Sequence, residues 1–139
     1  MTATISPQLG QIHALLADRG YEVSEPAPDT LKIRDTGSGV TIQAVLQGDI
    51  LFMSLVCTVV PESAVTPDVM GLMLASNNGI STSAFKLYEA SAGKIAIALN
   101  NFCKLQDLGA DDQDDILSCV HFLLVDVVSA RHLLSDLKA

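Results

Sequence analysis

The chain has 139 residues and a net charge of −8 at pH 7, and 49% of its residues are hydrophobic while only 17% are charged. A chain of this length fits one domain, which we place over residues 1–139. A domain of this size can bury a hydrophobic core without metals or disulfides. The negative charge and the absence of a lysine or arginine cluster argue against nucleic acid and membrane surfaces as partners. No stretch approaches the roughly 20 unbroken apolar residues of a membrane span.

The first half of the chain predicts one helix followed by three strands. Ser6 and Pro7 suit the cap and first position of a helix, and Gly20 suits its end. The proline-containing residues 25–29 cannot extend that helix. Alternating apolar and polar residues then predict strands at residues 31–34, 40–47 and 50–60, joined by turns as an antiparallel meander. The third strand is apolar on both faces, so we expect it to be central in a sheet covered on both sides.

The second half predicts a short helix, two strands and a long closing helix. Thr66-Pro67-Asp68 has the chemistry of a helix start, and Asn77-Asn78-Gly79 that of a helix end. Alternation predicts strands at 85–89 and 95–99, followed by a connection over residues 100–110. The predicted fold is therefore an α+β domain with a five-stranded antiparallel sheet, in the order α-β-β-β-α-β-β-α.

The closing helix, predicted from Asp112 to Lys138, is apolar over more of its circumference than one core requires. A stripe recurs at alternating spacings of four and three, and it comprises Ile116, Val120, Leu123, Val127, Ala130, Leu134 and Leu137. Apolar residues flank this stripe on both sides and widen the arc to about 240°, against the roughly 100° that one packing surface uses. We expect a second copy of the chain to cover the excess. The predicted interface residues are Cys119, Phe122, Val128 and Leu133, with Leu55 and Met53 as weaker candidates.

No motif in the sequence predicts a catalytic, cofactor or metal site. The last helix begins with four aspartates, Asp111, Asp112, Asp114 and Asp115, at the end where the helix dipole favours negative charge. The spacing of these aspartates does not match a calcium loop. The three histidines have no metal-ligand spacing, and we expect His132 to pair with Asp136. The three cysteines lack CxxC spacing and are expected to be small buried residues. The alternative is a ligand-binding or enzymatic site assembled from scattered polar residues, with Arg34, Lys86, His121 and Asp126 as candidates.

The element order, acidity, size and closing helix together resemble the type III secretion chaperone fold, and within it the YbjN-like group of sensory transduction regulators. The segments that carry the resemblance are Leu74-Ala75-Ser76-Asn77-Asn78, residues 85–99 and residues 116–137. The aromatic residue often found near the Asn-bearing segment of that group is missing here. The resemblance implies a homodimer without enzymatic activity, and a chaperone-like mode in which an extended segment of another protein binds along the sheet and first helix. The first ten residues lack the pattern of a signal peptide, so we expect a cytoplasmic protein.

Overall fold

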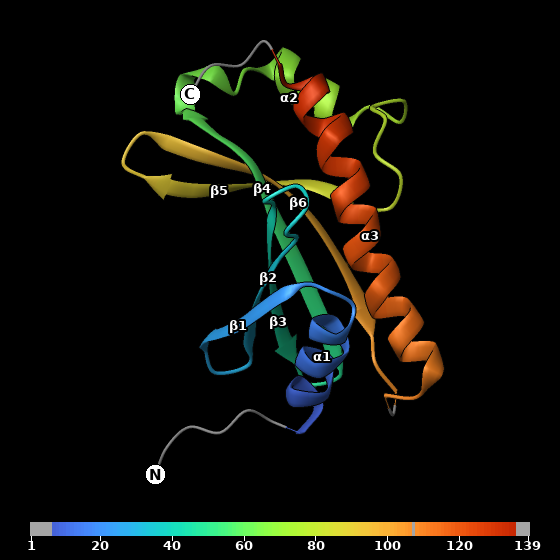
Figure 1. The fold of residues 1–139 in the computed structure, drawn as a ribbon. Helices are drawn as coiled ribbons and strands as arrows, with labels where there is room; N and C mark the ends of the chain where they lie inside the picture. The colour runs from blue at the N-terminus through green and yellow to red at the C-terminus, as the bar shows by residue number, and fades with distance from the viewer. Residues whose placement is uncertain (1–6, 107, 136–139) are drawn as a thin grey trace. The chain divides into compact units, whose positions relative to one another are not determined.

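The computed structural model describes residues 7–106 and 108–135, and these form an α+β fold with an antiparallel sheet (Figure 1). Its helices within this range are α1 (Pro7–Asp18), α2 (Pro67–Leu74) and α3 (Ala110–Leu133), with a short 3₁₀ turn, η1 (Glu62–Ala64). Its strands are β1 (Glu22–Ala27), β2 (Thr30–Arg34), β3 (Thr41–Gln47), β4 (Ile50–Pro61), β5 (Ala84–Ser91) and β6 (Lys94–Lys104). The sheet therefore has six strands in the described residues, and the prediction of five was wrong.

The missed strand is β1, which lies at one edge of the sheet, in the strand order β1-β2-β3-β4-β6-β5. It pairs antiparallel with β2, and its register shifts between Ser24 and Ala27, around Pro26. Proline cannot donate a hydrogen bond to a neighbouring strand, so it is tolerated only at edges and bulges. The proline that argued against a helix in this segment is thus compatible with an edge strand.

Strand β4 lies between β3 and β6, so the prediction of an interior strand is confirmed. The expectation that both of its faces are covered is wrong, because Phe52 and Val56 are 39% and 50% exposed. Their neighbours Leu51, Met53 and Leu55 are fully buried. The strand is apolar on both faces, yet only one of them lies in the core.

Strand β6 continues five residues beyond its predicted end at Leu99. Asn100 and Asn101, which resemble the end of an element in sequence, lie inside the strand. The amide of Asn100 donates to the hydroxyl of Tyr88 on β5, at 2.7 Å. The alternation then resumes, with Phe102 exposed and Cys103 buried.

The chain divides into two compact units, which we describe separately. Unit 1 comprises Met1–Ser54 and Phe102–His121. In its described part α1 packs against β1 and β2, and His13 of α1 pairs with Glu25 of β1. The side chains of Leu31, Ala44 and Met53 follow one another across β2, β3 and β4 in register and are fully buried. This row and the α1 stripe Leu9, Ile12 and Leu16 supply much of the buried apolar surface of unit 1.

Unit 2 comprises Leu55–Asn101 and Phe122–Ala139. Val60, Met73, Ile97 and Leu134 form a buried cluster there. Helix α2 begins as predicted, since the hydroxyl of Thr66 accepts a hydrogen bond from the amide of Val69 at 3.2 Å. The helix ends at Leu74, and the side-chain amide of Asn78 donates to the carbonyl of Met73 at 2.6 Å. The prediction that the asparagine segment closes this helix is thereby confirmed.

Helix α3 buries the predicted stripe. Ile116, Val120, Leu123, Val127, Ala130 and Leu134 are all 5% exposed or less. The predicted helix extends further, but Leu137, Lys138 and Asp136 lie outside the described residues, as does Ser6 at the other end of the chain. Within the described range α3 is long and apolar enough, by length and composition alone, to cross a membrane. A helix that packs into a protein core passes the same test, and α3 buries this stripe together with Asp126.

Candidate functional site

The part of α3 that belongs to unit 2 exposes large apolar side chains. Val125 is 47% exposed, Val128 is 69% exposed, and Phe122 is 37% exposed. Residues three apart are neighbours on a helix surface, so these side chains form one apolar strip. We call Phe122, Val125 and Val128 the outer strip of α3. An apolar strip that is exposed to solvent in the single chain is a candidate protein-binding surface.

The other predicted interface residues have different environments. Cys119 and Leu133 are half-buried on α3. Met53 and Leu55 are fully buried on β4, so they contribute to the core and present no surface to a partner. Val125, which the sequence did not single out, is more exposed than Phe122. Counting apolar positions around a helix predicts apolar surface on α3, but burial decides which of these positions are exposed to solvent.

The thiols of Cys103 and Cys119 lie within hydrogen-bonding contact of each other in unit 1. The Cys119 thiol also contacts the carbonyl oxygen of Phe102, with Sγ and O 3.7 Å apart. The hydrogen bond to Cys119, burial and the nearby carboxylates of Asp112 and Asp115 raise the pKa of Cys103. In unit 2, burial raises the pKa of Cys57 to about 11, although Arg131 lowers it in part. Cys57 and Cys103 are therefore protonated, weakly reactive thiols near neutral pH.

The Asp126 carboxylate on α3 holds a loop of unit 2. Asp126 is 1% exposed and accepts hydrogen bonds from three consecutive residues, Ser81, Thr82 and Ser83. The hydroxyls of Ser81 and Ser83 donate at 2.9 Å and 2.5 Å. Burial alone raises the pKa of the carboxyl, but these hydrogen bonds outweigh burial and hold the pKa of Asp126 below its usual value. The arrangement satisfies a buried charge and is a structural anchor.

A pair of aromatic rings lies on the open face of the sheet in unit 1. The ring centroids of Phe52 and Phe102 are 6.2 Å apart, and the rings are tilted by 43°. Phe102 is 64% exposed, and Val45 of β3 is the cross-strand neighbour of Phe52. Phe102 was missed because the sequence assigns it to a connection, and only the extension of β6 places it beside Phe52.

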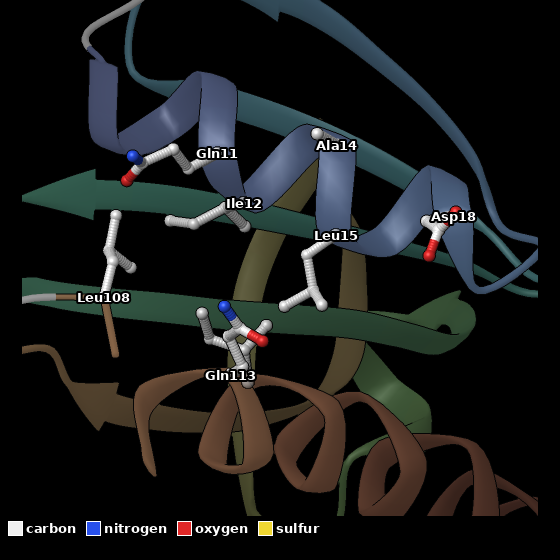
Figure 2. Close-up of a pocket in the computed structure, with 8 residues that line it drawn as sticks. Gln11, Ile12, Ala14, Leu15, Asp18, Leu108 and Gln113 are labelled. Carbon is white, nitrogen blue, oxygen red and sulfur yellow. The ribbon is translucent and has the colours of Figure 1, made fainter. Parts of the chain in front are cut away.

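Unit 1 also contains a pocket of about 460 Å³ (Figure 2). Helix α1 supplies most of its lining through Gln11, Ile12, Ala14, Leu15 and Asp18. Leu108 and two residues of α3, Gln113 and Ile116, complete the lining. Ile12 and Ile116 are buried and form an apolar floor, whereas the polar residues are exposed and form the rim. We call this cavity the α1–α3 pocket.

One wall of the α1–α3 pocket has an unusual backbone conformation. Leu108 has φ of 58°, a left-handed value that residues other than glycine rarely adopt. The buried carboxylate of Asp112 accepts hydrogen bonds from the amides of Gln106 and Leu108, at 2.8 Å and 2.7 Å. Asp112 therefore lies in the first turn of α3, where the sequence places it, and its carboxylate holds the backbone of the segment that carries Leu108 into the pocket wall.

The four polar residues of the alternative site do not line this pocket. The lining in the described residues contains none of Arg34, Lys86, His121 and Asp126. In unit 1, Arg34 pairs with Glu22 at 3.1 Å. In unit 2, Asp126 is occupied by the loop at residues 81–83. Within the described residues no group of three or more His, Cys, Asp or Glu side chains is placed to hold a metal ion.

No family model matches the chain, and the search of curated proteins finds no significant relative. Six chains of solved structures do match, among them the crystal structure of YbjN, described as a proposed transcription regulator from E. coli. That match has a TM-score of 0.69 and 16% sequence identity, and it covers 98% of this chain and 100% of the other. At this identity the likeness concerns the fold alone. The resemblance inferred from element order is therefore confirmed at that level, and the chain has a YbjN-like fold.

Proposed function

We propose that this chain is a non-enzymatic, cytoplasmic protein-binding domain that acts as a regulatory or adaptor module and forms a homodimer through the outer strip of α3. The observation that carries the proposal is the exposure of Val125 and Val128, at 47% and 69%, beside Phe122 on one helix surface. Burying such side chains releases roughly 25 cal/mol per Å² of apolar area. A second copy presents the same strip, so a two-fold contact is self-complementary.

The description of YbjN as a proposed transcription regulator supports a regulatory role. The net charge of −8 opposes direct contact with the phosphate backbone of DNA. We therefore propose that regulation by this chain acts through protein partners. Strand β5 is an edge strand whose side chains are mostly exposed, so it offers backbone groups to an extended segment of such a partner.

The test is the oligomeric state of a charge-substituted chain, measured by size-exclusion chromatography with light scattering. The wild type is expected to have the mass of a dimer. Replacing Val125 and Val128 together by Glu places charges in the contact and should give the mass of a monomer. Phe122→Glu should act in the same direction.

The matched control replaces Leu72 and Leu74 of α2 by Glu. These residues are also exposed and apolar, at 50% and 80%, and the double variant adds the same two charges. It should remain a dimer. A monomeric wild type, or a dimer that survives the α3 changes and dissociates with the α2 changes, would overturn the assignment of the outer strip.

A further inference from the structure

The α1–α3 pocket has the size and lining of a small-molecule site, which the proposed protein-binding role does not use. Its volume of about 460 Å³ is within the usual range for ligand pockets, roughly 300–1,000 Å³. Ile12 and Ile116 give it an apolar floor, and Leu15 and Leu108 are half-buried beside them. The pocket lies within unit 1, whereas the outer strip of α3 belongs to unit 2.

The rim has a defined charge. Asp18 is its carboxylate, the amides of Gln11 and Gln113 are its other polar groups, and no basic side chain is among the described lining residues. Asp18 makes no ion pair within the described part of the chain, and Arg19, which follows it, does not line the pocket. Figure 2 shows Asp18 at one end of the α1 side of the pocket and the Gln113 amide facing α1 from α3.

The helix end adds to this charge. Asp18 is the last residue of α1, and the carboxyl end of a helix carries a partial negative charge. The last turn of α1 contains no basic residue to offset it. The body of a ligand that fills the pocket therefore contacts apolar side chains. The end of the ligand near Asp18 lies in a negative electrostatic potential.

The wall at Leu108 indicates that the pocket is preformed. A left-handed leucine costs free energy, and such residues persist only where surrounding interactions impose them. Here the buried Asp112 imposes it through two backbone hydrogen bonds. The backbone at Leu108, a lining residue of the pocket, is thereby held without a ligand.

We propose that the α1–α3 pocket binds a small amphiphilic amine, that is, a primary ammonium group on a short alkyl chain. The alkyl chain packs on Ile12 and Leu15, and the ammonium donates hydrogen bonds to the Asp18 carboxylate. An anionic ligand of the same length is opposed by Asp18 and by the net charge of −8. A neutral alcohol gains only the apolar contact.

The test titrates the full chain with n-hexylamine, n-hexanol and hexanoate, each below its aggregation limit, and follows the backbone amides of Leu108 and Gln113 by NMR. Hexylamine should bind most tightly and hexanoate most weakly. Asp18→Asn should weaken hexylamine about threefold, as expected for an exposed charge interaction, and leave hexanol unchanged. Asp114→Asn, an exposed carboxylate of α3 outside the lining, is the matched control and should change neither.

A second pair of variants tests the location. Ala14→Trp places an indole over the pocket and should abolish binding of all three probes. Ala17→Trp introduces the same side chain at an exposed position of α1 that does not line the pocket, and it should have no effect. Equal affinity for hexanoate and hexylamine, or equal effects of the two tryptophan variants, would overturn the proposal. Neither result bears on the dimer, because no residue of the outer strip lines the pocket.

Discussion

A single carboxylate, Asp126, satisfies three consecutive residues of a loop, and its removal should be costly. Asp126→Ala leaves the amides and hydroxyls at residues 81–83 without their acceptor. Lost hydrogen bonds to a buried charge predict a decrease of about 2–4 kcal/mol in the free energy of unfolding. Urea denaturation measures this decrease. The control is Asp114→Ala, at an exposed position of the same helix, which should change the free energy of unfolding by less than about 0.5 kcal/mol. Equal losses in the two variants would contradict the anchoring role.

The same carboxylate predicts how stability depends on pH. Burial raises the pKa of Asp126, but the hydrogen bonds from Ser83, Ser81 and Thr82 lower the pKa by more than burial raises it. The pKa in the folded state therefore lies below the pKa in the unfolded state. A depressed pKa contributes stability that is fully present above the unfolded pKa, about 3.9, and is lost as pH falls through the folded pKa. The stability difference between wild type and Asp126→Asn should therefore be constant above about pH 5 and shrink below about pH 4. A difference that grows on acidification would show that the folded pKa is raised.

Helix α2 is short and depends on its cap. With eight residues it has little intrinsic stability, and the Thr66 hydroxyl satisfies one amide of its first turn. Thr66→Ala should lower the free energy of unfolding by about 1 kcal/mol. Thermal or urea unfolding measures the change, and Thr36→Ala in the turn at residues 35–39 is the control for losing a threonine hydroxyl at an exposed site. An effect of Thr36→Ala as large as that of Thr66→Ala would argue against the cap.

The elements that the sequence predicted are those whose signal is local. Alternation and capping residues located α2, β3 and β4 to within about two residues, and the 3.6-residue period located the buried stripe of α3. Strand β1 was missed because an edge strand with a proline has neither alternation nor a buried face of its own. The end of β6 was missed because Asn100 has the side chain of a turn residue, and its partner Tyr88 lies on another strand.

The candidate sites were harder to predict than the fold. Excess apolar surface on α3 was visible in the sequence, because a helix has a fixed period. The α1–α3 pocket was not, since it joins residues 11–18 to residues 108–116 and depends on the conformation of Leu108. Side chains brought together from distant segments leave no spacing pattern. The set Arg34, Lys86, His121 and Asp126 was chosen from residue type alone, and none of the four lines this pocket.

At the scale of the whole molecule, two copies that associate must overcome mutual repulsion, because each carries a net charge of −8. Salt screens this repulsion, with a Debye length of about 10 Å at 0.1 M and about 3 Å at 1 M, and it leaves apolar contact intact. The proposed dimer should therefore tighten, by about threefold or more, as NaCl rises from about 0.02 M to about 0.5 M. Sedimentation equilibrium measures the dissociation constant at each concentration. An interface held by ion pairs would instead weaken with salt, so a higher dissociation constant at high NaCl would contradict an apolar contact through Val125 and Val128.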